Sequence, residues 1–214
     1  MPLALSVAKE FTKLSLNGEE PDPLTNMRLQ KLLYYAQAWS MVVRGTDLFP
    51  EELQAWRLGP VVPVVYKHCK NNEANPGIAS CLPSQSQEKY RLLPLDDFEG
   101  IPDVSASIAD FLANVWESYK FYSALALHKQ THTESPWLNA WGDRAKEETS
   151  NQRIEPDAMI RYFDSVVKPD AIERYSLAEE QREVAAREQL DALPRIDKAK
   201  FRQYAVSVSS SLNN

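Results

Sequence analysis

The feature that most constrains the fold is the segment LLYYAQAWSMVV, which lies between Lys31 and Arg44. It spans roughly a dozen residues, well below the ~18–20 apolar residues that a helix needs to cross a bilayer. Its apolar residues recur at three- and four-residue intervals, and they occupy more than one face of the resulting helix. A helix that is apolar on several faces is central to its domain, so we expect the other elements to surround this one.

Local signals mark both ends of this helix. Thr25 can cap its N-terminus, Leu24 can pack onto Leu29, and Gly45 ends it. Its expected inward face contains Leu29, Leu32, Leu33, Ala36, Ser40 and Val43. Tyr35, Trp39 and Val42 widen this face, and Tyr34 and Met41 extend the apolar surface to the other side of the helix.

The same periodicity predicts further helices. They cover residues 3–16 and 63–70, a stretch from Asp103 or Ser105 to about Lys120 with another helical turn after it, a short segment that begins at Pro136, and residues 156–167. Their expected inward residues are Leu3, Val7, Phe11, Leu14, Val64 or Val65, Ile108, Phe111, Leu112, Val115, Trp116, Met159, Ile160, Phe163 and Val166. Tyr119, Tyr122, Leu125 and Leu127 continue the aromatic and apolar content into the added turn.

The segment AWRLGPVVPVVYKH, residues 55–68, is too apolar for a free loop and too interrupted for one helix or strand. We predict a short strand around residues 53–56, a turn at Gly59-Pro60 and a helix that starts at Pro63, where the missing N–H costs nothing. YRLLPL, residues 90–95, is a candidate second strand. The predicted fold class is therefore mainly α (α+β): a compact helical domain around a central buried helix, with a small β-hairpin or short strands.

A change in composition divides the chain. Residues 1–167 are predicted to form one domain, with a polar loop at 71–89. From Lys168 the chain is rich in Ala, Glu, Gln and Arg, which are strong helix formers, but its apolar stripe is thin. Residues 168–214 are thus expected to be a C-terminal helical extension with a flexible tail: an added helix, an arm that reaches a partner, or a loosely attached end.

Charge and cysteine content limit the function classes. The 214 residues carry a net charge of −6, and a chain without a basic cluster is a poor candidate for nucleic-acid binding, which depends on Lys and Arg contacts to phosphate. Cys69 and Cys81 form no CxxC pair and are read as free thiols. With no evident signal peptide, we expect a cytoplasmic protein without a membrane partner.

Two constellations could carry chemistry. His128 and His132 are four residues apart and would share a helix face, as zinc-binding pairs do, with Cys69, Cys81, His68 or Glu134 as possible third ligands. The alternative is that His132 is a hydrogen-bonded structural histidine at a helix end. A cysteine nucleophile would need a histidine beside its thiolate, but the neighbours His68 and Cys69 point in different directions on a helix. Residue chemistry alone therefore indicates no convincing active site.

The aromatic residues allow two interpretations. Trp, Tyr and Arg dominate binding hot spots, although aromatic residues are more often part of a core. The residues to which this applies are Tyr34, Trp39, Trp56, Arg57, Tyr66 and Trp137.

Three segments, which we call the signature segments, resemble in their order the Panacea (SocA-like) domain of bacterial and phage proteins. They are LTNMRLQKLLYYAQAW (24–39), AWRLGPVVPVVYKH (55–68) and THTESPW (131–137). The resemblance covers about residues 5–167. The matching residues are Leu29, Gln30, Lys31, Leu32, Leu33, Tyr34, Tyr35, Trp39, Ala55, Trp56, Gly59, Pro60, Val61, Val62, Pro63, Val65, Tyr66, Thr131, His132, Glu134, Pro136 and Trp137.

The resemblance implies an antitoxin that neutralises a cognate toxin by direct binding, without catalysis and without a cofactor. Family members include a proteolytic adaptor that delivers its toxin to the ClpXP protease, and this is the alternative function. A small metal-dependent hydrolase that uses His128 and His132 is a third hypothesis. The candidates for partner binding or for the shared scaffold are Lys31, Tyr34, Trp56, Arg57, Gly59, Pro60, Pro63, Tyr66, His132, Glu134 and Trp137. The identity of the toxin and the oligomeric state stay open.

Overall fold

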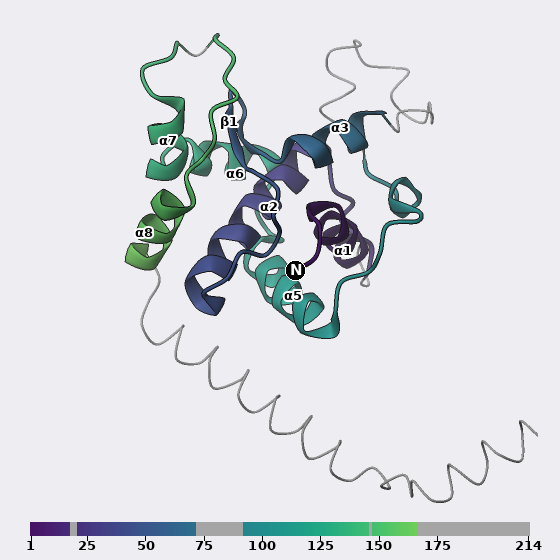
Figure 1. Ribbon diagram of the computed structural model, residues 1–214. Coiled ribbons are helices and arrows are strands. Elements are labelled where there is room, and N and C mark those ends of the chain that lie inside the picture. The colour runs from purple at the N-terminus through teal and green to yellow at the C-terminus, as the bar shows by residue number, and fades with distance from the viewer. Residues whose placement is uncertain (18–20, 72–91, 146, 167–214) are drawn as a thin grey trace, which may run out of the picture. The chain divides into compact units, whose positions relative to one another are not determined.

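The protein is described by a computed structural model that covers residues 1–17, 21–71, 92–145 and 147–166. These ranges form seven α-helices and a two-stranded sheet, which agrees with the predicted mainly helical fold (Figure 1). The helices are α1 (Ala4–Leu16), α2 (Asn26–Trp39), α3 (Pro63–Asn71), α5 (Ala106–Tyr119), α6 (Ala124–Thr131), α7 (Ser135–Trp141) and α8 (Pro156–Val166). The strands are β1 (Gln54–Trp56) and β2 (Gly59–Val61), and two short helices complete the set, the π-helical η1 (Ser40–Arg44) and the 3₁₀ helix η3 (Leu95–Phe98).

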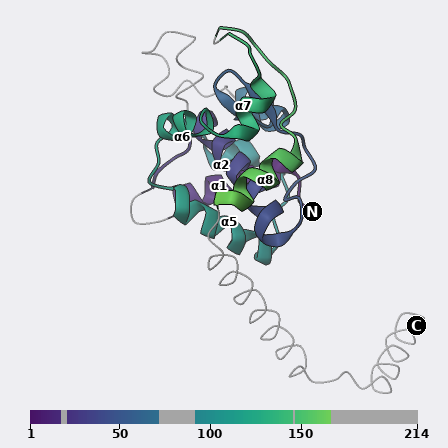
Figure 2. The same ribbon diagram turned by 90° about the vertical axis from the view of Figure 1, so that its left-hand side faces the viewer.

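Helix α2 lies in the middle of the described helices, as its apolar faces predict. It packs against α1, α3, α5, α6, α8 and β2, and two perpendicular views show it surrounded (Figures 1 and 2). The side chains of Leu29, Leu32 and Leu33 are fully buried. Thr25 caps the helix as expected, because its hydroxyl accepts a hydrogen bond of 3.3 Å from the backbone N–H of Arg28.

The end of this central helix differs from the prediction. We expected one regular helix up to Gly45, but from Ser40 to Arg44 the backbone forms π-helical hydrogen bonds. The Ser40 hydroxyl donates 2.9 Å to the carbonyl of Thr46 beyond the helix end. Gly45 terminates the segment with a φ of 67°, a left-handed conformation that glycine adopts at low cost.

The outer helices follow the predicted periodicity, with three corrections on their faces. Phe111, Leu112, Val115 and Trp116 of α5 are buried as predicted, and Val65 rather than Val64 enters the core from α3. The prediction that Leu3, Ile160 and Val166 face inward is wrong, because their side chains are 54%, 40% and 51% exposed. Leu3 precedes the first residue of α1, and α8 is a surface helix whose narrow buried stripe holds only Met159 and Phe163.

The sheet is a hairpin, residues 54–61, and its turn lies elsewhere than predicted. Gln54 pairs with Val61 and Trp56 with Gly59 in antiparallel register, so the two-residue turn is Arg57-Leu58. Gly59-Pro60 belongs to β2 and does not form the turn. The predicted second strand at residues 90–95 is also wrong for its described part, because Leu92 makes an isolated bridge with Thr25 and η3 begins at Leu95.

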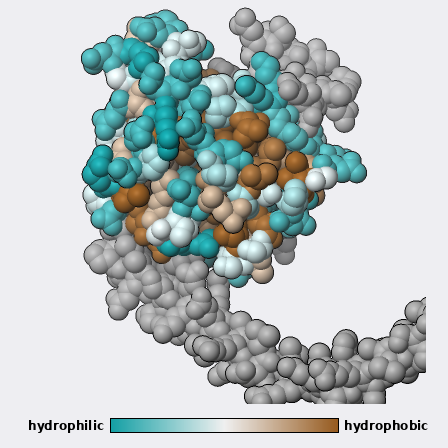
Figure 3. All heavy atoms as spheres, in the orientation of Figure 1, coloured by the Kyte–Doolittle hydropathy of each residue, from teal (hydrophilic) through white to brown (hydrophobic). Residues whose placement is uncertain are grey.

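Other expectations concern residues outside the described ranges. The predicted polar loop at 71–89 and the extension at 168–214 fall almost wholly on such residues, as does Cys81. On the face shown in Figure 3, hydrophobic residues gather near α1 and α3, and hydrophilic residues cover the region of α7. None of the helices in the described ranges combines the length and apolar composition that a membrane crossing requires.

Candidate functional site

The backbone of the hairpin is held at both edges by hydrogen bonds to distant parts of the chain. Along the free edge of β1, the Ala55 N–H donates to the Gln152 carbonyl and the Ile154 N–H donates to the Leu53 carbonyl, each at 2.8 Å. Next to β2, the Val62 N–H donates 2.8 Å to Oε1 of Gln30, a buried side chain of α2. The conformation of this short hairpin therefore depends on the surrounding helices, since an isolated two-stranded hairpin is marginally stable at best.

Side chains of the other two signature segments, together with His128 just before the third, donate to backbone carbonyls of the hairpin. From α6 and α7, Trp137 Nε1 reaches the Trp56 carbonyl at 3.1 Å, His132 Nε2 the Arg57 carbonyl at 3.0 Å and His128 Nδ1 the Leu58 carbonyl at 3.2 Å. From α2, the Lys31 ammonium donates 3.1 Å to the Pro60 carbonyl. We call these four bonds the carbonyl network.

Lys31 is the most unusual member of the carbonyl network. Its side chain is 1% exposed, and full burial lowers the pKa of its ammonium group to about 7, because the charged form loses its hydration. Pro60 O is the hydrogen-bond acceptor that the described residues provide for it. Gly59 packs directly on this lysine: a Cβ at residue 59 would lie 2.7 Å from Lys31 Nζ. The close approach requires glycine, as does its φ of 101°.

A buried carboxyl group joins the first and third signature segments. Glu134, 1% exposed, directly precedes α7 and accepts hydrogen bonds from the Tyr35 hydroxyl at 3.0 Å and the Gln130 amide at 3.3 Å. Burial raises the pKa of the Glu134 carboxyl, which these donors and the nearby Tyr34 hydroxyl oppose. The Tyr34 hydroxyl lies near this carboxyl group but does not form a hydrogen bond of normal geometry with it. The Tyr34 hydroxyl oxygen and Glu134 Oε2 are therefore both buried without a hydrogen-bond partner among the described residues.

The turn of the hairpin forms one wall of a pocket, which we call the hairpin pocket. Its volume is about 310 Å³, and it lies between α2, the hairpin and the start of α3. It is lined by Asn26, Met27, Gln30, Lys31, Trp56, Arg57, Leu58, Val61, Tyr66, Thr149 and Ser150.

With this geometry established, comparison with known proteins identifies the family. The family model described as Antitoxin SocA-like, Panacea domain, matches residues 29–138, just over half of the chain. The chain belongs to the SocA-like Panacea family. The matched range runs from α2 to α7 and contains most of the three signature segments and all four side chains of the carbonyl network.

One curated relative of the Panacea chain is Antitoxin SocA of Caulobacter vibrioides (strain NA1000 / CB15N). It is 47% identical over 45 residues, which cover 21% of this chain and 24% of SocA. The Panacea chain thus matches about a quarter of that relative's length. No solved structure matches the chain.

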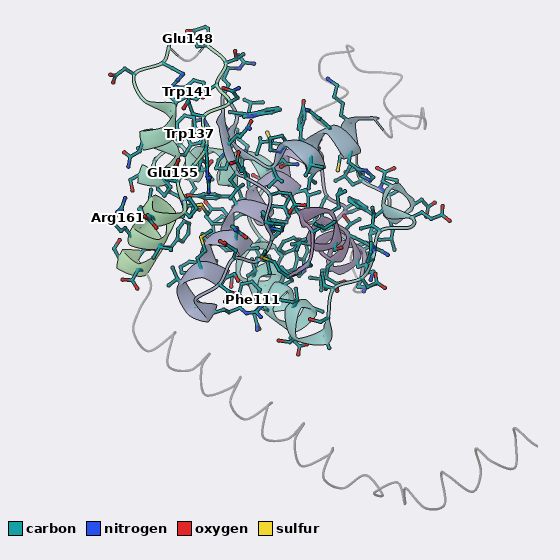
Figure 4. The ribbon with its side chains drawn as sticks, in the orientation of Figure 1. Phe111, Trp137, Trp141, Glu148, Glu155 and Arg161 are labelled. Carbon is teal, nitrogen blue, oxygen red and sulfur yellow. The ribbon has the colours of Figure 1, made fainter. Side chains whose placement is uncertain are left out.

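The structure separates the predicted site residues of this Panacea domain by exposure. Lys31, Tyr34, Gly59, Pro60, Glu134 and Trp137 are buried, Trp56, Pro63, Tyr66 and His132 are half-buried, and Arg57 is exposed. Pro63 begins α3 as predicted. On α7 the rings of Trp137 and Trp141, both labelled in Figure 4, stack with centroids 5.2 Å apart.

The histidines of the proposed metal pair have structural contacts. His132 ends α6, its two ring nitrogens face the carbonyls of His128 and Arg57, and its ring lies 3.9 Å from that of Trp137. This confirms the interpretation of His132 as a hydrogen-bonded histidine at a helix end. His68 faces the Asp97 carbonyl at 2.7 Å, and Cys69 is buried. Among the residues that the structure covers, no three His, Cys, Asp or Glu side chains gather as a metal site.

Sequence reasoning missed two members of this site. Gln30 was matched to the family pattern but not selected, and His128 was considered only as a metal ligand. Both bind backbone groups of the hairpin. The available signal for Gln30 was a polar residue within a helix that is apolar on several faces, where a buried amide needs a partner.

Proposed function

We propose that this protein is an antitoxin that neutralises a cognate toxin by direct protein–protein binding. The single observation that carries the proposal is how the signature segments use their polar side chains. Lys31, His132 and Trp137 bind backbone carbonyls of the hairpin, as does the neighbouring His128. The turn of the hairpin carries the exposed Arg57 beside the half-buried Trp56. Membership of the SocA-like Panacea family and the antitoxin name of the SocA relative support the same function.

The physical argument concerns the cost of binding. A surface loop that must become ordered in a complex loses conformational entropy, and this loss weakens the complex. A turn whose flanking carbonyls are already bonded to α2, α6 and α7 loses less. Arg and Trp are residue types that dominate binding hot spots, so the hairpin turn is well suited to hold a partner.

The test is co-expression with the protein encoded beside this gene. We expect that protein to arrest growth when it is expressed alone, this protein to restore growth, and the two to co-purify as a complex. Failure to restore growth together with the absence of a complex would contradict the proposal. The experiment repeated in cells without ClpXP separates direct neutralisation from proteolytic adaptation: protection that persists supports direct neutralisation, and protection that disappears supports the adaptor.

A further inference from the structure

The hairpin pocket has a one-sided charge. The two basic side chains that line it are Lys31 and Arg57, and no carboxylate is among the lining residues of the described structure. This is unexpected in a chain with a net charge of −6. The exposed guanidinium of Arg57 is therefore opposite in sign to the net charge of the protein, and it favours an anionic group.

Arg57 is available to such a group. Its guanidinium makes no hydrogen bond or ion pair with the residues that the structure describes, although its own backbone carbonyl is bound by His132. The backbone of the turn is thus positioned while the charged group stays exposed. Because a guanidinium offers a planar set of donors, it can bind a carboxylate through two parallel hydrogen bonds.

The remaining walls fit a short aliphatic segment. The rings of Trp56 and Tyr66 meet edge to face with centroids 4.9 Å apart, and the Trp56 indole N–H is bonded to Gln54 at 3.0 Å. Met27, Leu58 and Val61 add further apolar surface. A half-open pocket of about 310 Å³ admits a side chain, not a folded element.

We propose that the hairpin pocket receives a glutamate side chain of the toxin. Its carboxylate pairs with the Arg57 guanidinium, and its methylene groups lie against Trp56 and Tyr66. The inference rests on the proposed antitoxin function and specifies where and through which chemistry the toxin binds.

Charge complementarity selects this occupant over the alternatives. A lysine or arginine of the partner would bring a like charge towards Arg57 and Lys31, which costs free energy in a partly desolvated site. A purely apolar side chain would cover Arg57 without pairing it, which leaves a desolvated charge. Glutamate combines an apolar stem with a carboxylate, and aspartate has a shorter stem with less to offer the aromatic walls.

The experiment uses the full-length protein and the toxin encoded beside it. A photo-crosslinking amino acid placed at position 58, which lines the pocket beside Arg57, identifies the toxin residues that lie there. Isothermal titration then compares wild type with Arg57→Ala and Arg57→Lys. The matched control is Lys129→Ala, which removes an exposed cation of α6 that does not line the pocket. The cross-linked glutamate is changed to glutamine for a double-mutant cycle with Arg57→Ala.

We expect Arg57→Ala and the toxin glutamate variant each to weaken binding about 10- to 100-fold, and the double variant to be little weaker than either single one. Arg57→Lys should lose less, and Lys129→Ala should bind within about twofold of wild type. Additive losses, wild-type affinity of Arg57→Ala, or a cross-link to the toxin's C-terminal residue or to a segment without glutamate would overturn the inference. If wild type itself does not bind the toxin, the proposed function fails instead, so the two failures are distinguishable.

Discussion

Gly59 lies so close to Lys31 that a single methyl group at residue 59 would stand 2.7 Å from Nζ and 2.8 Å from Cε. The same methyl group would also stand 2.9 Å from the Thr131 hydroxyl. Residue 59 is therefore the point at which all three signature segments meet. This contact lets the Lys31 ammonium reach the next carbonyl along the strand, that of Pro60.

Gly59→Ala should destabilise the protein strongly. The substitution places a side chain at a φ of 101° and against a buried lysine, so we expect the free energy of unfolding to fall by about 2–4 kcal/mol. Gly45→Ala is the matched control, because Gly45 also has a positive φ, 67°, but has nothing within 4 Å of a Cβ. It should cost only about 1 kcal/mol. Urea denaturation measures both, and equal losses would refute the steric role of Lys31.

Lys31→Met should remove a pH dependence of stability. The pKa of Lys31 is about 7 in the folded protein against an ordinary value of 10.5. Between these values the unfolded chain binds more protons, so wild-type stability should rise with pH by up to about 1.4 kcal/mol per unit. Between pH 7.5 and 8.5 we expect wild type to gain about 1 kcal/mol relative to Lys31→Met. Lys129→Met, at an exposed position, should keep the wild-type slope.

Glu134→Gln should affect stability with the opposite sign. Because burial raises the pKa of Glu134 above 4.5, the folded protein binds more protons than the unfolded chain just above that pH, and wild-type stability declines as pH rises through this window. The glutamine variant has no such decline and should gain on wild type from pH 4.5 to 7. Chemical denaturation at several pH values measures this, and a constant difference would contradict it.

Glu134→Ala provides the comparison for that residue. It leaves the Tyr35 hydroxyl without its acceptor and opens a cavity, so we expect a loss of about 2–4 kcal/mol at any pH. A variant as stable as Glu134→Gln would show that the hydrogen bond of the carboxyl group contributes little.

Trp137→Phe should weaken toxin binding as well as folding. It removes the indole donor to the Trp56 carbonyl and thereby loosens the hairpin turn. We expect a loss of about 1 kcal/mol in stability from the missing hydrogen bond and roughly tenfold weaker binding. Trp141→Phe is the control, since its indole donates to the Arg144 carbonyl outside the hairpin. Trp141→Phe should lose stability but keep the wild-type affinity for the toxin. Equal affinities of the two variants would argue against a role of the hairpin turn in toxin binding.

The helices of this protein could be predicted because their determinants are local. The repeat of Leu29, Leu32 and Leu33, the cap at Thr25 and the prolines at 63 and 156 depend on residues a few positions apart. The π-helical end at Ser40 and the exposure of Ile160 could not be predicted, because they depend on what packs against those positions. The signature segments were likewise visible in the sequence, but the groups that their side chains bind could not be predicted from it.

Only the tertiary structure decided which groups the signature residues bind. Lys31, His132 and Trp137 donate to backbone carbonyls, and a backbone carbonyl has no residue type that a sequence pattern could indicate. The Gly-Pro pair at residues 59 and 60 illustrates the difference. In the sequence it predicts a turn, because glycine and proline are turn residues. In the fold it lies in a strand, where glycine is required because a lysine 28 positions earlier occupies the space of its side chain.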